Sequence, residues 1–507
     1  MTTEIKDNNI VDNAEKKREL QPGEKILLFT AFIAAVLCDR LFFNVAIKQT
    51  DNIFYFTAVF EVCFIILFYV CNWGKIYKSA LLWVIAGLLI LLCAWNFIFD
   101  YASSYGYLTF VVIPASLMMF TQLAVINHGL KDIGGMVASW FSGWFIKPFC
   151  AIAKCIEALS AVLFPKGGKN SHIIKKVIAA VVITAPLITL LIFLLSGADK
   201  VFGYYTNKIF ASFDIGEFIL HAFLIAAGFL LFYSFFWNGR YAKPKCYENA
   251  LKKEYRADNL VVYIILSSVL VLYVLFCAVQ FAYLFASAGL PAGISYSEYA
   301  REGFAQIVVI SGINLIIFGC VLKYGKIHKP EEKDWILKIM LYILIAVTAI
   351  MLTSGFMRLG LYINTFGMTF LRLISAWFII YLSLVLVLCA ARLIKEKLPL
   401  IACCAVLLLF AYTALGYMNP DAFIVKYNLS ENSGYSGADR VNGWVGQNSA
   451  YVFYNLSDDA LNVLLSEGLD KNDYAGLLER RSVESAGKRS LASMKLRAAL
   501  HLFDGAE

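Results

Sequence analysis

The sequence predicts an all-α integral membrane protein with about eleven transmembrane helices, in-plane amphipathic helices and a small extracytoplasmic C-terminal cap. Hydrophobic residues make up 60% of its 507 residues and charged residues only 16%, and the mean hydropathy is +0.70. An average globular chain is about 45 to 50% apolar and about 25% charged. Apolar runs of roughly 20 residues recur, and a helix of that length crosses about 30 Å of hydrocarbon. These observations exclude a soluble, disordered or collagen-like chain.

Three parts are predicted along the chain: a cytoplasmic tail over residues 1–25, a transmembrane helical bundle over 26–417 and an extracytoplasmic C-terminal domain over 418–507. The tail mixes both charge signs and lacks the apolar core of a signal peptide. The predicted spans cover approximately residues 26–47, 52–72, 79–99, 107–126, 178–196, 217–238, 259–284, 303–322, 335–356, 368–391 and 398–417.

Charge in the connecting segments predicts the orientation. The net charge is +8, and residues 418–507 hold more acidic than basic side chains, so the positive excess lies in residues 1–417. Starting with the N-terminal tail, every second segment holds most of the Lys and Arg residues, as the positive-inside rule requires of cytoplasmic loops. The N-terminus is therefore predicted to be cytoplasmic. With an odd number of spans, the C-terminal domain is then extracytoplasmic.

Residues 138–164 are predicted to form an amphipathic helix in the membrane plane rather than a span. Trp144 and Phe149 fall on one apolar stripe, whereas Lys154 and Glu157 fall elsewhere. Burial of these two charges at mid-membrane is expensive, while an interfacial helix keeps them in water. The aromatic-rich stretch that follows residue 200 is a second candidate for an in-plane helix.

The C-terminal domain is predicted to be mostly helical. The turn signal Asn419-Pro-Asp follows the last span, and Ser457 is placed as the N-cap of a helix over residues 460–466. Glycine and polar residues predict a loop over 430–448. Helical patterning resumes from about 485 to 503.

Signatures of soluble enzymes are absent from the sequence, which has no phosphate-binding loop, no zinc-protease helix motif and no nucleophile elbow. The 12 cysteines all lie between Cys38 and Cys404, mostly in apolar runs, so neither disulfides nor a zinc site is predicted. No catalytic residue, metal ion or cofactor is therefore predicted. The basic excess is attributed to anionic lipid headgroups rather than to nucleic acid.

Ionisable residues inside the predicted spans are the main candidates for a site, because a charge at membrane depth costs roughly 2.5 kcal/mol or more and tends to be paired. Asp39 and Arg40 lie in the first span, Glu61 in the second and Arg372 in the tenth. These side chains are predicted to gather in one polar cluster that opens away from the cytosol. Two roles stay open, namely structural ion pairs and a ligand or proton site. His221 is interpreted as a structural hydrogen bonder rather than a relay.

Two stretches at the outer interface extend this cluster. Glu298, Arg301 and Glu302 lie at the water-accessible start of the predicted eighth helix, where acid and base could meet a ligand. Arg358 and Tyr362 lie one helical turn apart at the outer end of the ninth span. The candidates for this outer-rim polar cluster are Asp39, Arg40, Glu61, Glu298, Arg301, Glu302, Arg358, Tyr362 and Arg372.

Several strings in the chain resemble a known family. They are Ser196-Gly-Ala-Asp199, Gln280-Phe-Ala-Tyr283, Ser295-Tyr-Ser-Glu-Tyr-Ala-Arg-Glu-Gly-Phe304, Arg358-Leu-Gly-Leu-Tyr362, Gly367-Met-Thr-Phe-Leu-Arg372 and Asn419-Pro-Asp421. From about the fifth span onward, the chain resembles uncharacterised bacterial polytopic membrane proteins grouped as domain of unknown function 4173, and its relative 4153. The resemblance implies a bacterial cytoplasmic-membrane protein and supplies no assigned reaction.

Three functions of different classes fit these features. The first is a non-enzymatic envelope scaffold or sensor component, which contacts membrane lipids and meets an envelope protein through residues 418–507. The second is a secondary transporter that uses the intramembrane charges as a substrate or proton site. The third is a transferase for lipid-linked substrates, with Glu298 or Glu302 as the base. The missing enzyme motifs place the first function ahead of the others.

Overall fold

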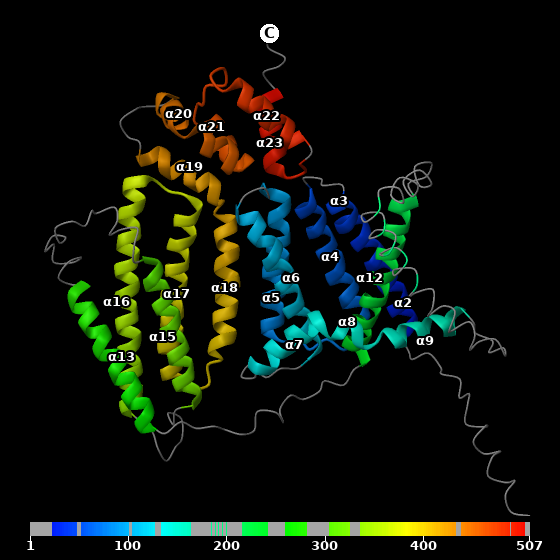
Figure 1. Ribbon diagram of the computed structural model, residues 1–507, viewed down its shortest axis with the longest axis horizontal. Helices are drawn as coiled ribbons and strands as arrows, with labels where there is room; N and C mark the ends of the chain where they lie inside the picture. The colour runs from blue at the N-terminus through cyan, green and yellow to red at the C-terminus, as the bar shows by residue number, and fades with distance from the viewer. Residues whose placement is uncertain are drawn as a thin grey trace, which may run out of the picture. The chain divides into compact units, whose positions relative to one another are not determined.

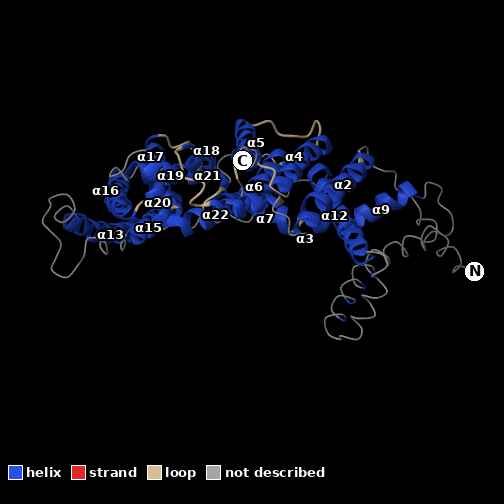
Figure 2. Cartoon of the chain, turned by 90° about the horizontal axis from the view of Figure 1, so that it is seen from above, coloured by secondary structure: helices blue, strands red, loops and turns tan. Residues whose placement is uncertain are grey.

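The computed structural model describes residues 23–47, 52–100, 104–126, 133–163, 215–241, 259–280, 304–324, 335–431, 438–486 and 488–501, with the single positions 184, 188, 191, 195 and 199. Every regular element in these residues is a helix (Figure 2). Among them are 10 helices that are long and apolar enough to cross a membrane. The predicted all-α polytopic membrane fold is thus confirmed. The predicted span over residues 178–196 lies almost wholly outside the described residues, so the total of eleven stays a prediction.

The described helices fall into two compact units, one with Met1–Ser79, Leu117–Asn127 and Met136–Pro244, the other with Ala80–Ser116, His128–Gly135 and Lys245–Glu507. Helices wholly in the first unit are α2 (Glu24–Cys38), the π-helix η1 (Asp39–Phe43), α3 (Asn44–Ile47), α4 (Ile53–Cys71), α8 (Lys147–Cys150), α9 (Ile152–Leu163) and α12 (Ile215–Tyr241). Helices wholly in the second are α5 (Ala80–Ile98), α13 (Asn259–Gln280), α15 (Phe304–Tyr324), α16 (Trp335–Phe366), α17 (Phe370–Ile394), α18 (Leu400–Tyr417), α19 (Pro420–Glu431), α20 (Ala438–Asn455), α21 (Asp458–Ser466), α22 (Ala475–Ala486) and α23 (Leu491–His501). α6 (Ser104–Val125) and α7 (Ile133–Phe145) contribute residues to both units.

Small residues let α2 and α12 pack closely in the first unit. Ala31 and Ala35 are buried one turn apart on α2, and a Cβ added to Gly228 of α12 would lie 3.5 Å from the Cβ of Ala35. Small side chains at this spacing bring membrane helices into contact. Phe64 of α4 fills the adjoining space, with its ring centroid 5.6 Å from that of Phe236 on α12. The first unit is therefore built around the α2–α12 pair.

Three short helices replace the single in-plane helix predicted over residues 138–164, so its predicted continuity is wrong. The breaks between the three helices lie at Ile146 and Ala151, where φ is −114° and −120°. Pro148 explains the first break, because it lies in the first turn of α8 and has no N–H to donate to the preceding helix. Figure 1 shows α8 and α9 running across α2 and α12 rather than along them, the direction that an interfacial helix requires.

The second unit contains the longest described helix. α16 has 32 residues, or about 48 Å at 1.5 Å per residue, and therefore exceeds the hydrocarbon thickness of about 30 Å. Its core-facing side chains pack with those of α13, α15 and α17, including Leu266, Phe318, Leu341 and Cys389. Arg358 and Tyr362 lie within this helix, which continues to Phe366, beyond the predicted end of the span at residue 356.

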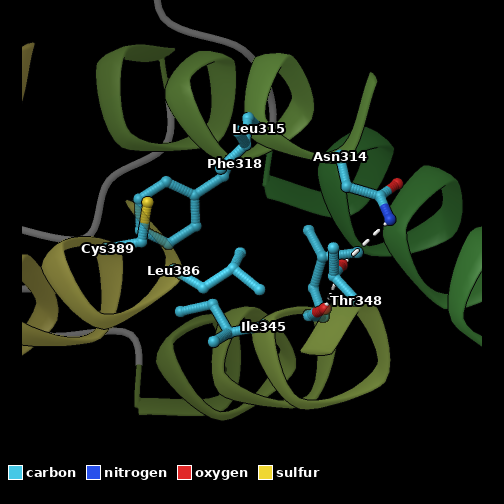
Figure 3. A pocket seen from close by; sticks show the side chains of 8 residues that line it. Asn314, Leu315, Phe318, Ile345, Thr348, Leu386 and Cys389 are labelled. Carbon is cyan, nitrogen blue, oxygen red and sulfur yellow. Dashed lines mark hydrogen bonds between the residues drawn. The ribbon is translucent and has the colours of Figure 1, made fainter. Parts of the chain in front are cut away.

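A small cavity lies among α15, α16 and α17 (Figure 3). Its polar side is a chain of hydrogen bonds in which Tyr273 donates to the Asn314 carbonyl at 2.7 Å and the Asn314 amide donates to Thr348 at 2.9 Å. The cavity volume is about 10 Å³, which is the room that one water molecule needs. This cavity is therefore too small for an organic substrate.

Helices α19 to α23 form a C-terminal domain with a hydrophobic core of its own. Figure 1 shows α19 lying across the ends of α16, α17 and α18. The loop predicted over residues 430–448 is wrong from Ala438 onward, since α20 begins there. Val441, Trp444 and Val445 of α20 recur at helical spacing and are buried against Leu461 of α21 and other core residues. Burial of these three side chains outweighs the glycine and polar content that predicted a loop.

Candidate functional site

The end of span α5 brings a carboxylate into the C-terminal domain. Asp100 follows α5 and is 1% exposed. Two hydrogen bonds hold its flanking segments to α18. The Trp95 indole donates to the Gly416 carbonyl at 3.0 Å, and the Tyr105 hydroxyl donates to the Tyr412 carbonyl at 2.8 Å. These contacts fix the position of Asp100 relative to the last span.

The first turn of α21 meets one carboxylate from α19 and one from the segment that follows α5. Ser457 is the N-cap residue, as predicted, but its side chain makes no capping hydrogen bond to α21. Instead, the Ser457 N–H donates to Asp421 at 3.2 Å and the Asp458 N–H donates to Asp100 at 2.9 Å. Helix starts leave such N–H groups unsatisfied and favour negative charge. The two carboxylates therefore accept hydrogen bonds from backbone N–H groups at the start of α21, in place of a capping side chain.

Two buried cations balance part of this negative charge. The Lys488 ammonium lies 3.2 Å from Asp100 and 3.6 Å from Asp458. The Arg481 guanidinium donates to Asp458 at 2.8 Å, and the Ser493 hydroxyl donates to the other oxygen of Asp458 at 2.6 Å. We call this set the Asp100 cluster, and its ionisable members are Asp100, Asp421, Asp458, Asp459, Arg481 and Lys488.

The remaining carboxyls of the Asp100 cluster have pKa values near neutrality. Burial raises the pKa of Asp459 to about 7, although the Asp100 N–H donates to its carboxylate at 2.7 Å and opposes the shift. Burial likewise raises the pKa of Asp421 to about 6, against hydrogen bonds from Ser457. Four carboxyls thus face two cations, and the cluster gains or loses protons between about pH 5 and pH 8.

The centre of the Asp100 cluster is shielded from solvent. The side chains of Asp100 and Asp458 are 0% exposed and those of Lys488 and Arg481 are 6% and 11% exposed, so a substrate has no access to them. Among the described residues, no group of three or more His, Cys, Asp or Glu side chains could hold a metal ion. The cluster oxygens are instead occupied by N–H and cationic donors.

Three of the sequence-predicted site residues lie in the first unit. Asp39 is the first residue of the π-helix η1 and is 1% exposed. It forms a hydrogen bond with His221, in which Asp39 Oδ1 and His221 Nδ1 are 2.6 Å apart. The Arg40 side chain is 62% exposed, with its Nε 3.8 Å from the Asp39 carboxylate. Glu61 is buried on α4, which packs against η1. The structure therefore adds His221 to this group.

Three other predicted residues lie in the second unit. Arg358 is buried on α16, and the guanidinium of Arg372 lies 4.2 Å from the ring centroid of Tyr362. Arg372 also donates to the carbonyls of Phe366 and Gly367, which end α16. Arg372 thus stabilises the turn between α16 and α17, and this favours a structural role for it. Because these residues and Asp39 belong to different units, a common pocket stays a prediction.

The remaining predicted residues, Glu298, Arg301 and Glu302, lie outside the described residues. Sequence reasoning in turn missed the members of the Asp100 cluster as a site. Asp458 and Asp459 could be noticed only as acidic residues at a helix start. Nothing in their spacing links them to Asp100, which lies more than 350 positions earlier in the chain.

The turn between α16 and α17 offers a test of how the C-terminal domain is attached. Asn428 of α19 accepts from the Met368 N–H at 2.6 Å and donates to the Met368 carbonyl at 2.9 Å. Asn428→Ala leaves both buried backbone groups unsatisfied and is expected to destabilise this contact by about 2 kcal/mol. Hydrogen exchange of the segment around Met368 in the full-length protein measures the effect. Ser430→Ala, at an exposed position of the same helix, should change exchange little; equal effects of both substitutions would contradict the prediction.

The fold and the buried charges define a polytopic helical membrane protein with a folded C-terminal domain. Residues 86–467 match the family described as Domain of unknown function (DUF4153), and the chain belongs to this family. The match begins within α5 and ends after α21, so it includes the four aspartates of the Asp100 cluster. Of the two families that the sequence resembles, this is the one that the match supports. No curated protein and no solved structure matches the chain.

Proposed function

We propose that this protein is a non-enzymatic scaffold or sensor component of the bacterial cytoplasmic membrane, with its N-terminus cytoplasmic and its C-terminal domain extracytoplasmic. The Asp100 cluster carries this proposal. It joins a span to a domain that has its own core, through side chains that no substrate reaches. An arrangement of this kind couples the domain to the membrane helices and needs no reaction.

Protonation gives the proposed sensor a physical input. Asp459 and Asp421 have pKa values of about 7 and about 6, so their ionisation changes around neutral pH. Each ionisation adds negative charge beside Asp100 in a buried site, where repulsion is weakly screened. The attachment of the domain to α5 is therefore expected to respond to the pH on its side of the membrane.

Exposed apolar side chains give the proposed scaffold a surface for an envelope protein. Val483 of α22 is 71% exposed, and Leu491 and Met494 of α23 are 45% and 48% exposed. The two helices pack against each other. Exposed apolar groups with polar surroundings are common in protein interfaces.

Site-specific photocrosslinking in cells tests the partner. A crosslinking amino acid at Val483 is expected to give a discrete adduct, whereas the same amino acid at the exposed loop position Asp473 gives none. The adduct should be lost in Arg481→Met, which removes one cation of the Asp100 cluster, and kept in Arg480→Met. Failure to form an adduct at Val483, Leu491 and Met494 alike would exclude a partner on this surface.

A secondary transporter is the second candidate, and the first unit supplies the observation that favours it. Asp39 lies eight residues before the end of α3 and Glu61 eight residues after the start of α4, so both carboxyls are about 12 Å from these helix ends. Buried carboxyls at one depth are a feature of ion pathways. Reconstituted vesicles that show no solute flux and no proton coupling across a broad panel would exclude transport.

A further inference from the structure

The first unit contains a buried carboxylate–imidazole pair. Asp39 Oδ1 and His221 Nδ1 are 2.6 Å apart, with 0% and 10% of the two side chains exposed. The second oxygen of Asp39 and the second nitrogen of His221 are buried and have no hydrogen-bond partner among the described residues. Buried polar atoms of this kind are rare in proteins, since each costs about 1 to 3 kcal/mol. The pair therefore holds two groups that can accept or release a proton.

The backbone at Asp39 is also unusual. Residues Asp39–Phe43 form a π-helix between α2 and α3, where the regular hydrogen-bond ladder of the span is interrupted. Such π-helical turns occur frequently at functional sites. The extra residue in this turn changes the direction of the side chains that follow α2, and Asp39 meets α12 there.

Glu217 connects the pair to the surface. It lies one turn before His221 on α12, with a carboxylate oxygen 3.7 Å from His221 Nε2 and a side chain that is 32% exposed. The three side chains thus form a series. It begins at the buried carboxyl of Asp39, continues through the imidazole of His221 and ends at the carboxyl of Glu217, which is in contact with solvent. The two ring nitrogens of His221 face the two carboxyls, one each.

Other charged and titratable groups surround this series. On the described helices that pack around it, they include Cys38 at the end of α2, Arg40 on η1 and Glu61 on α4. Titratable groups that lie close together influence one another's protonation. The protonation of Asp39 and His221 is therefore a property of the whole group rather than of one residue.

We propose that Glu217, His221 and Asp39 form a proton-exchange site that carries protons between water at Glu217 and the buried carboxyl of Asp39. The Glu217 carboxylic acid donates its proton to His221 Nε2, and His221 releases its Nδ1 proton to Asp39 Oδ1. The imidazole ends neutral with its proton moved from one nitrogen to the other, Glu217 ends ionised and Asp39 ends protonated. The site belongs to the first unit and is independent of the function proposed for the C-terminal domain.

Magic-angle-spinning NMR of the full-length protein in lipid vesicles, with ¹⁵N-labelled histidine, tests this proposal. His221→Gln identifies the His221 signals among the five histidines. The ¹⁵N signals of the His221 ring are expected to show both the Nδ1–H and the Nε2–H tautomer, because the proposed step moves the ring proton from one nitrogen to the other, and Asp39→Asn is expected to change the ratio of the two. Glu217→Gln is expected to slow exchange of the Nε2 proton with water by about 100-fold or more.

The control is Glu157→Gln on α9, a half-exposed carboxylate of the same unit that pairs with Lys154 at 3.2 Å. It should leave the His221 exchange rate unchanged. Glu217→Asp should restore part of the rate lost in Glu217→Gln, and protection of α2 and α12 from hydrogen exchange shows that each variant is folded. A His221 ring fixed in one tautomer, or an exchange rate unaffected by Glu217→Gln, would overturn the proposal.

Discussion

Arg481→Met is expected to destabilise the C-terminal domain by about 3 to 5 kcal/mol. The substitution keeps the long apolar stem but removes the guanidinium that lies 2.8 Å from Asp458. Asp458 is 0% exposed, so its carboxylate is left with Lys488 at 3.6 Å as its nearest cation. Removing one partner of a buried ion pair has an effect of this size because the other charge stays desolvated. Hydrogen exchange of the α21 amides in the full-length protein reports the change locally.

The neighbouring residue provides the matched control. Arg480 pairs with Glu484 at 2.9 Å, but its side chain is 60% exposed. Arg480→Met is therefore expected to change the stability far less than Arg481→Met, as is usual for surface pairs. If the two substitutions had the same effect on α21, the Asp100 cluster would not be the attachment that we describe.

Acidification is expected to stabilise the C-terminal domain. Burial raises the pKa values of Asp459 and Asp421 from an ordinary value of 3.8 to about 7 and about 6, so the folded domain binds protons more tightly than the unfolded chain. Their contribution to stability is fully present below about pH 4 and is lost as the pH rises through 6 to 7. Between pH 5 and pH 8 we expect a loss of about 2 to 4 kcal/mol, at about 1.4 kcal/mol per pKa unit.

Asp459→Asn isolates the larger of these two contributions. The amide oxygen can still accept from the Asp100 N–H but carries no charge. The variant is expected to be more stable than the natural protein at pH 8 and to lose most of the pH dependence of α21 exchange, after correction for the intrinsic effect of pH on amide exchange. A natural protein that became less stable from pH 8 to pH 5 would contradict the prediction.

Hydrophobicity and helix-end signals were sufficient to predict most of the fold. Span α18 ends just before Asn419-Pro-Asp, as predicted, because proline cannot continue the helix that precedes it. The ninth span was predicted to end near residue 356, whereas α16 continues to Phe366 and ends before Gly367, whose φ is 75°. The predictions failed where tertiary burial outweighs composition. α20 contains glycines and polar residues, yet Val441, Trp444 and Val445 bury enough apolar surface to form a helix.

The candidate site was predictable only in part. Asp39 could be identified because a charged residue within an apolar span is conspicuous, but its contact with His221 depends on how α12 packs on α2. The Asp100 cluster had no such signal. Asp100, Asp458 and Lys488 all lie in polar segments, where carboxylates and amines are ordinary, and only the folded chain removes them from water.

Asp100 belongs at once to the end of a lipid-embedded helix and to the interior of the C-terminal domain. Free-energy linkage between two such parts is reciprocal. A ligand that tightens the domain by a given amount must favour, by the same amount, the position of α5 that keeps Asp100 in place. Conversely, a tilt or axial shift of α5 that withdraws this one carboxylate would destabilise the first turn of α21. A change within the bilayer would then cause local unfolding of the domain.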